Sequence, residues 1–305
     1  MVEQRRGVIA PQPRRPERRR PPRSVVVRRR LVALGVLLAA LIGIGFAVAS
    51  VRDRGHKAST PTVAAPPKPF RVIFPEGFTR LQMAARVKSV AEIATHERGR
   101  KPRLNESAYL AASGRKRLIP GFGRRPLEGF LFPATYQFTA RSSAAELVSS
   151  QLQAFRRNWS TVNLAYARSK KLTPYDVLTI ASMVEKEAVA PEERPKIARV
   201  IYNRLHAGMA LGIDATVRYA FHVPGTQSLL ESQLNSDNPY NTRKRVGLTP
   251  TPIANPGLAS MQAAAHPAHV DYLYFVRKPD KKHHFFTASY AAFLRYERAH
   301  GYGVH

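Results

Sequence analysis

The stretch TPYDVLTIASMVEKE, residues 173–187, decides the fold because it specifies a helix, its start and its buried face. Thr173 can cap the first turn, Pro174 suits the first helical position, and Asp176 completes a capping box. At 100° per residue, the apolar side chains form one stripe that contains Val177, Ile180, Ala181 and Val184. This pattern predicts a helix packed into the core of an α+β domain.

Two carboxylates end this helix, and they flank the apolar stripe on opposite sides. Glu185 and Glu187 therefore border the buried face, whereas Lys186 points toward solvent. Partial burial and a nearby helix C-terminus both favour a protonated carboxyl, the form a general acid needs. The alternative is that both are ordinary boundary residues paired with Lys186, Arg194 or Lys196. Periodicity does not choose between these readings, or between the two glutamates.

The segments around this helix carry both helical and strand patterns, as an α+β domain requires. We expect helices at residues 144–159 and 191–205, a polar loop at residues 236–257, and a hairpin of residues 272–276 with residues 284–287. Such a long loop inside a compact domain is usually functional.

The upstream part of the chain predicts a smaller α+β unit at residues 70–120. Residues 70–74 alternate as a strand would, and residues 75–77 (PEG) suit a turn. Thr79 suits the cap of a first helix that runs to about Val87. We expect a separate helix at residues 90–96 and another after Asn105.

Composition narrows the possible functions. The chain of 305 residues has no cysteine and a formal net charge of +29. Such a charge predicts an anionic partner, either nucleic acid, a lipid surface or an acidic polymer. No phosphate-binding glycine loop, serine-nucleophile elbow or zinc-binding helix motif is present. We therefore expect no cofactor and no metal, and we look to carboxylate chemistry.

The N-terminal region predicts a membrane anchor. Residues 1–30 carry eleven arginines against Glu3 and Glu17 and read as a basic, disordered cytoplasmic tail. Leu31–Val51 is an uncharged apolar run long enough to cross a bilayer, and residues 52–69 form a proline-rich linker. The positive-inside rule then places residues 52–305, with a net charge of +20, outside the plasma membrane. A cleaved signal peptide is the alternative.

Several motifs in one order resemble the MltG-type, or YceG-like, endolytic murein transglycosylases. ASMVEKE at residues 181–187 is similar to the family's catalytic motif. The others are LEGFLFPATY at 127–136, ERPKIARVIYNRL at 193–205, GMALGIDATVRY at 208–219, PYNT at 239–242, GLTPTPIANPG at 247–257, YLYFV at 272–276 and HFF at 284–286. Single motifs are weak, but several in order are specific. The resemblance covers roughly residues 70–300.

The resemblance implies an enzyme that cuts the β-1,4 bond between N-acetylmuramic acid and N-acetylglucosamine within peptidoglycan strands. One glutamate, here Glu185, would act as acid and then as base, leaving a 1,6-anhydro end. This differs from the two-carboxylate scheme of most glycosidases. The resemblance also implies a LysM-like module at residues 70–120 and a catalytic domain at residues 121–305.

Other roles and partners follow from the same resemblance. Candidate groove residues are Glu128, Asp214, Tyr240, Asn241 and Asn255. Expected partners are peptidoglycan strands, the membrane and peptidoglycan synthases, with no nucleic acid.

Some positions depart from the family pattern, or have a structural alternative. The departures are Ala134, Gly212 and the pair Ala292-Phe293. Because of Ala134 and Ala292, an inactive wall-binding or division-scaffold protein of the same fold stays an alternative. Asn203 and Arg204 could be structural, with Arg204 paired to Glu128 or Glu193. Core packing is the better reading for Tyr272, Tyr274 and Phe275.

Overall fold

The computed structural model describes residues 32, 35, 69–99 and 101–302. The chain divides into a unit of residues 1–66 and a compact unit of residues 67–305. The predicted tail, membrane segment and linker lie outside the described residues, apart from isolated positions. Among the described residues, no helix combines the length and the apolar character needed to cross a membrane.

The compact unit begins with a strand and two helices whose ends are set by local sequence. β1 (Phe70–Ile73) leads through a turn to α2 (Arg80–Arg98), which has the predicted Thr79 cap and a capping box with Gln82. α3 (Glu106–Ser113) follows with Asn105 as its cap. The expected break between residues 87 and 90 is wrong: α2 contains no Gly or Pro and runs on to a left-handed Gly99.

Strand pairing joins residues far apart in the sequence. β1 pairs antiparallel with β4 (Thr135–Phe138), with Phe70 opposite Phe138. Between α3 and β4 the chain forms a hairpin of β2 (Arg117–Ile119) and β3 (Gly123–Arg125). The pairing of β1 with β4 crosses residue 120, and the division into modules there stays a prediction.

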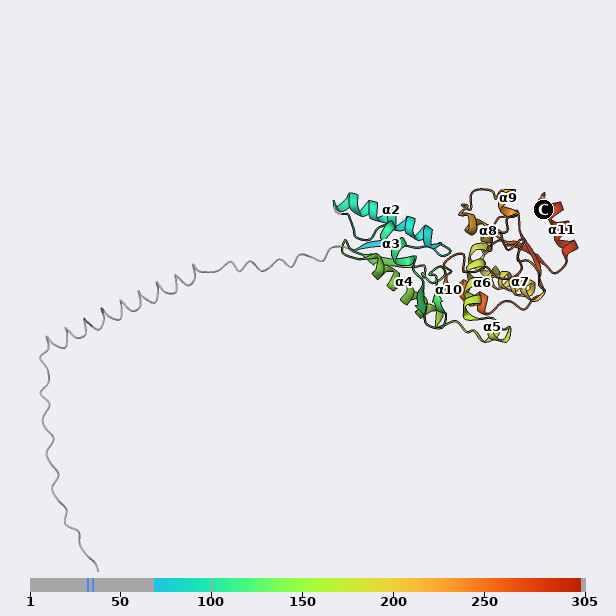
Figure 1. The fold of residues 1–305 in the computed structure, drawn as a ribbon, viewed down its shortest axis with the longest axis horizontal. Helices are drawn as coiled ribbons and strands as arrows, with labels where there is room; N and C mark the ends of the chain where they lie inside the picture. Colours follow the sequence, from blue (N-terminus) through green and yellow to red (C-terminus); the bar gives the residue numbers. More distant parts are fainter. Residues whose placement is uncertain (1–31, 33–34, 36–68, 100, 303–305) are drawn as a thin grey trace, which may run out of the picture. The chain divides into compact units, whose positions relative to one another are not determined.

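The rest of the chain contributes α6 (Pro174–Glu187), which has the predicted bounds and capping box. The others, in order, are α4 (Ala144–Trp159), α5 (Ala165–Ser169), the 3₁₀ helix η1 (Pro191–Glu193), α7 (Arg194–His206), α8 (Asp214–Phe221), α9 (Glu231–Leu234), α10 (Leu258–Ala265) and α11 (Tyr290–Ala299). Figure 1 shows α10 between the group of α2, α3 and α4 and the group that contains α6, α7 and α8. The observed class is mixed α+β.

The C-terminal hairpin confirms the predicted strand pairing. β5 (Tyr274–Arg277) pairs antiparallel with β6 (His284–Thr287). Aromatic contacts hold it, including Tyr272 on Phe286 with ring centroids 5.7 Å apart and Phe275 on Phe286 at 5.9 Å. Tyr272, Tyr274 and Phe275 therefore pack, as expected.

One hydrophobic core runs through both ends of the compact unit. Phe130 is fully buried and contacts Phe122, Phe155 and Tyr175, with ring centroids 4.9, 5.0 and 6.1 Å away. These rings join the β2–β3 hairpin, α4 and α6. The preceding Gly129 has φ +90°, and a Cβ atom there would lie 2.6 Å from the ring of Pro252.

We predict that Gly129→Ala lowers the free energy of unfolding by more than Gly208→Ala, measured by chemical denaturation. Both glycines have positive φ, so each substitution should cost about 1 kcal/mol or slightly more. Gly208 has open space around it, whereas Gly129 meets Pro252, which adds about 1–3 kcal/mol of overpacking. Equal losses in the two variants would contradict this packing.

Candidate active site

Glu185 lies at the C-terminal end of α6 and is held by two other helices. Its Oε2 accepts a hydrogen bond of 3.0 Å from the backbone N–H of Gly257, the N-cap of α10. The Arg194 guanidinium, at the start of α7, lies 3.9 Å from Oε1. Only 6% of the Glu185 side chain is exposed, so these contacts act in a shielded environment. The carboxylate therefore meets a cation and a helix N-terminus together.

Arg194 is itself oriented by the protein. Its Nε donates a 3.1 Å hydrogen bond to Oγ of Ser260, which is fully buried in α10. α10 thus contributes twice to the site, through the Gly257 N–H and through Ser260. The pairing of Glu185 with Arg194, predicted as the structural alternative for this glutamate, is seen, and the same contact fixes the orientation of the carboxylate.

Glu76 is a site residue that the sequence reasoning missed. It lies in the turn after β1, and its carboxylate packs on Gly257, where a Cβ atom would be 1.9 Å from Oε1. Much of Glu76 is exposed, but partial burial of its carboxyl and the negative charge of Glu185 raise its pKa, while Arg194 opposes the shift. The only signal in the sequence was the predicted turn at residues 75–77 (PEG). A turn prediction does not show which part of the fold Glu76 will contact.

Glu187, on the other flank of α6, has a different environment. Burial raises its pKa to about 7, with a further contribution from the Asp214 charge. The backbone N–H of Ala215 bonds to it, and Ile213 provides no side-chain cap for α8. Glu187 therefore supports the start of α8.

Lys186 is exposed, as expected, but its ammonium also donates to the Gly77 carbonyl at 3.3 Å.

Glu128 is a buried acceptor rather than an open groove residue. It receives the Arg80 backbone N–H at 3.0 Å, the Tyr219 hydroxyl at 3.2 Å and the Asn255 amide at 2.8 Å. Burial raises its pKa to about 7, and these hydrogen bonds oppose the shift. Glu128 thus joins the first turn of α2 to α8 and to the long loop.

Both the oxygen and the nitrogen of the Asn255 side-chain amide form hydrogen bonds within the protein. Oδ1 accepts from the backbone N–H groups of Gly129 and Leu131, each at 2.9 Å. Nδ2 donates to the Phe78 carbonyl and to Glu128, and the residue is fully buried. Asn255 therefore positions the loop and the turn that carries Glu76, and direct sugar contact by Asn255 or Glu128 stays an untested prediction.

The remaining candidate groove residues differ in exposure. Asn241 is fully buried and donates to the carbonyls of Leu234 and Ser236. Tyr240 is half-buried, and its hydroxyl lies 2.9 Å from the Thr251 hydroxyl. About half of the Asp214 side chain is exposed.

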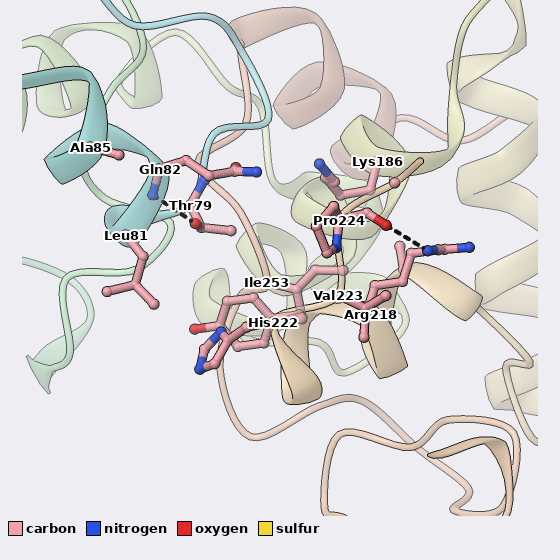
Figure 2. A pocket seen from close by; sticks show the side chains of 13 residues that line it. Thr79, Leu81, Gln82, Ala85, Lys186, Arg218, His222, Val223, Pro224 and Ile253 are labelled. Carbon is pink, nitrogen blue, oxygen red and sulfur yellow. Dashed lines mark hydrogen bonds between the residues drawn. The ribbon is translucent and has the colours of Figure 1, made fainter. Parts of the chain in front are cut away.

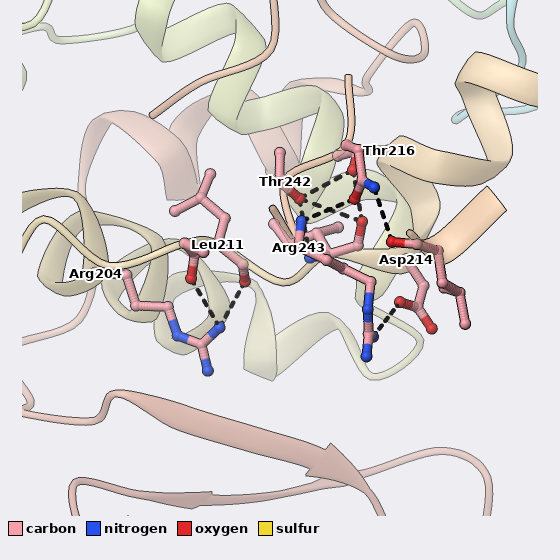
Figure 3. Close-up of polar contacts among 10 residues, drawn as sticks. Arg204, Leu211, Asp214, Thr216, Thr242 and Arg243 are labelled. Carbon is pink, nitrogen blue, oxygen red and sulfur yellow. Dashed lines mark hydrogen bonds and ion pairs between the residues drawn. The ribbon is translucent and has the colours of Figure 1, made fainter. Parts of the chain in front are cut away.

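Figure 3 shows how the long loop is attached to α8. Arg243 forms an ion pair of 2.8 Å with Asp214, and Thr242 lies 2.9 Å from the hydroxyl of Thr216. Only Asp214 and Tyr240 of the five candidates retain surface that a ligand could contact.

A cavity of about 370 Å³ lies between the start of α2 and α8. Figure 2 shows Thr79, Gln82 and Ala85 facing Lys186 and Arg218 across it. Polar and apolar side chains share the lining, which includes the cations Lys186 and Arg218, the imidazole of His222, and Leu81, Val223 and Ile253. The lining includes Lys186, the residue after Glu185, but not Glu185 itself.

Asn203 and Arg204 are structural, but not through the expected ion pairs. Asn203 donates to the carbonyls of Val270 and Tyr272. Arg204 donates to the carbonyls of Leu273 and Leu211, each at 2.6 Å, rather than to Glu128 or Glu193. Glu193 instead accepts from the backbone and ring of His284.

The departures from the family pattern have structural surroundings of their own. Gly212 has φ +62°, and a Cβ atom there would lie 3.0 Å from the Arg204 guanidinium, so a larger residue would be crowded. The Ala134 carbonyl accepts the Phe74 N–H at 3.1 Å. Phe293 packs on Tyr274, with ring centroids 5.4 Å apart. None of these contacts involves Glu185.

Fold and site together define an α+β protein in which α6 presents a shielded glutamate, Glu185, and the next residue, Lys186, lines a cavity. The YceG-like family matches residues 55–299. The chain belongs to this family.

Named relatives support the same assignment. Over 155 residues the chain is 41% identical to an endolytic murein transglycosylase of Bacillus subtilis, covering 51% of this chain and 43% of that one. Over 179 residues it is 37% identical to one of Streptococcus pneumoniae, covering 57% and 31%. The chain thus spans less than half the length of these relatives. The crystal structure of a yceG-like protein from Listeria monocytogenes matches 74% of this chain and 75% of its own, with a TM-score of 0.63 and 29% identity.

We predict that Glu187→Gln stabilises the protein more at pH 7 than at pH 5. The folded pKa of about 7 lies above the ordinary value of 4.5, so the folded state retains a proton that the unfolded state has lost. The stabilising effect of protonated Glu187 is thus fully present below about pH 4.5 and disappears as pH rises through 7. Gln mimics the protonated form at every pH. Melting temperatures of both proteins across pH 5–7 check this, with exposed Glu92→Gln as control. A difference that does not grow with pH would contradict the assignment.

Proposed function

We propose that this protein is an endolytic peptidoglycan lytic transglycosylase, with Glu185 as its acid and base. The observation that carries the proposal is the placement of Glu185 against the Gly257 N–H and Arg194, at the family's catalytic motif. Membership of the YceG-like family and the named relatives in Bacillus and Streptococcus support the reaction type. The substrate would be the glycan strand of peptidoglycan.

The geometry suits a single carboxyl group that gives up a proton and then takes one back. Glu185 donates its proton to the bridging oxygen as the bond from that oxygen to C1 of muramic acid breaks. The Gly257 N–H and Arg194 then stabilise the carboxylate that remains. Glu185 next accepts the proton of the same sugar's 6-hydroxyl as the C1–O6 bond forms. The glutamate is regenerated, and no water is consumed.

The surroundings of Glu185 suit an anionic polymer. A cavity lined by Lys186, the residue after Glu185, and by Arg218 has a volume of about 370 Å³, which falls within the range of small-ligand sites. Residues 52–305 carry a net charge of +20. Peptide stems of the wall bear carboxylates, which this charge would attract.

We further propose that the protein is a single-pass plasma membrane protein. Leu31–Val51 would span the bilayer, the tail of residues 1–30 would face the cytoplasm, and the catalytic part would face the wall. A LysM-like module at residues 70–120 and peptidoglycan synthases as protein partners belong to the same proposal. An inactive scaffold of this fold is the second candidate. The oriented, shielded Glu185 disfavours it, because a scaffold has no use for that arrangement.

We expect Glu185→Gln to lose at least about 100-fold in rate on purified peptidoglycan, because an amide cannot transfer the proton. Its melting temperature should stay near that of wild type, since Gln keeps the shape and can still accept from Gly257. Glu187→Gln should lose much less, and Glu92→Gln nothing. Mass spectrometry of the wild-type digest should show anhydro ends, one water lighter than hydrolytic products.

Two results would overturn this mechanism. Reducing ends in the wild-type digest would mean hydrolysis rather than transglycosylation. An active Glu185→Gln together with an inactive Glu187→Gln would place the chemistry on the other flank of α6. A wild-type protein with no cleavage at all would favour the scaffold.

The topology is tested by a reporter fused after residue 51. We expect the reporter to lie outside the cytoplasm and the protein to fractionate with membranes, because the arginines stand on the N-terminal side of the apolar run. A soluble mature protein that begins near Ser50 would show a cleaved signal instead.

A further inference from the structure

We propose that a cavity between α5 and α7 is a second ligand site of this protein, and that it binds the carboxylate of an acidic peptide. None of the five candidate groove residues lines this cavity. The carboxylate site is argued from the contacts of Arg199 on α7. Naming the peptide stems of peptidoglycan as the source of the carboxylate rests on the proposed function.

The cavity has the size and the charge of a site for a small anionic group. Its volume of about 310 Å³ lies at the lower end of the range of small-ligand sites. Its polar lining comes from Tyr166 and Lys170 at α5 and from Arg199, Tyr202, Asn203 and His206 on α7. No aspartate or glutamate is among the residues described as lining it. Lys170 and Arg199 therefore make the cavity positive.

Arg199 is a buried cation whose contacts are all to neutral oxygens. Only 9% of the residue is exposed. Its Nε donates to the Ala268 carbonyl, and its Nη1 donates to the Tyr166 hydroxyl at 2.6 Å. In the part of the chain that the structure describes, no carboxylate lies within ion-pair distance of this guanidinium. Because a buried charge is normally paired, an anionic ligand would supply the missing counter-charge.

One atom of this guanidinium is left to meet a ligand. Nη2 of Arg199 makes no hydrogen bond to any residue that the structure describes, and it is not sealed from solvent. The Lys170 ammonium lies 5.6 Å from the centroid of the Tyr166 ring, and the Arg199 guanidinium lies 5.2 Å from it. These cation–π contacts hold two positive charges beside the same ring. A carboxylate in the cavity would therefore meet both.

The rest of the lining favours a peptide over a simple anion. Asn203 donates its amide nitrogen to the carbonyls of Val270 and Tyr272, and its Oδ1 has no donor among the described residues. That oxygen can accept an N–H of a peptide bond. The Tyr202 ring packs against the Tyr166 ring with centroids 5.7 Å apart, which gives the ligand an apolar wall. A carboxylate followed by an amide matches this pattern.

The site is separate from the Glu185 carboxylate. Arg194, which pairs with Glu185, and Arg199 are five residues apart on α7, which places them roughly 140° apart around the helix. The cavity beside Lys186 and this one have no lining residue in common. Asp271 shares a neighbouring hollow with Arg199 but is exposed and outside ion-pair distance. The peptide would therefore contact the protein at a second place.

Calorimetric titration of the full-length chain in detergent tests the site. The probe is an N-acetylmuramoyl tripeptide with free carboxylates, which has no glycosidic bond and so reports binding without cleavage. We expect the same probe with amidated carboxyls to bind at least about tenfold more weakly, because the charge-assisted contacts are lost. Lys170→Glu should weaken binding of the free acid by a similar factor. The matched control is Lys88→Glu, the same charge change at an exposed position on α2, which should leave the affinity nearly unchanged.

Substitutions of Arg199 separate a ligand contact from a structural one. Arg199→Met should also bind the free acid at least about tenfold more weakly, whereas Arg199→Lys keeps the charge and should retain more of the affinity. If Arg199→Met does not fold, Lys170→Glu decides, because Lys170 is exposed.

Three results would overturn the site: a wild-type protein that does not bind the free acid at millimolar concentration, equal affinity for the free and amidated probes, or equal effects of Lys170→Glu and Lys88→Glu. Each of them is compatible with anhydro ends in the wild-type digest, so the proposed function would stand. A protein that binds the free acid through Lys170 and Arg199 but forms no anhydro ends would contradict the proposed function and leave the carboxylate site in place.

Discussion

The candidate site depends on one buried amide. Asn255 satisfies two backbone N–H groups after Glu128, the carbonyl of Phe78 and the Glu128 carboxylate at the same time. A buried polar side chain that lost these partners would cost about 1–3 kcal/mol for each group left unpaired. The long loop, the start of α2 and the segment after β3 therefore have one mutual arrangement. Gly257, two residues further on, is placed by the same constraint.

That arrangement makes the site a product of several elements rather than of one motif. α6 supplies Glu185, α7 supplies Arg194, α10 supplies an N–H group and a serine, and the turn after β1 supplies Glu76. Each group is individually ordinary. Their convergence shields the Glu185 carboxylate and gives it interactions that water would weaken.

Local sequence predicted what local interactions decide. The bounds of α6, its capping box and the β5–β6 pairing follow from cap chemistry and alternation, and all are seen. Glu76 was missed because its position depends on β1 pairing with β4, far along the chain. Asn241 and Asn255 were named as groove residues through the family resemblance alone, and their burial depends on contacts with distant segments that the sequence does not reveal. α2 was split in two because apolar spacing alone does not show that a helix continues.

The hydrogen bond between Asn255 and Phe78 joins residues 177 positions apart in the sequence. Closing so large a loop costs chain entropy that only late, cooperative packing can recover. The N-terminal segment leaves the ribosome early, yet it can bond to Asn255 only after most of the chain has been made. A nascent or partly unfolded chain can therefore contain the whole motif of residues 181–187 and still lack the assembled site. Such a dependence on complete folding would keep the proposed activity silent until the whole chain has folded.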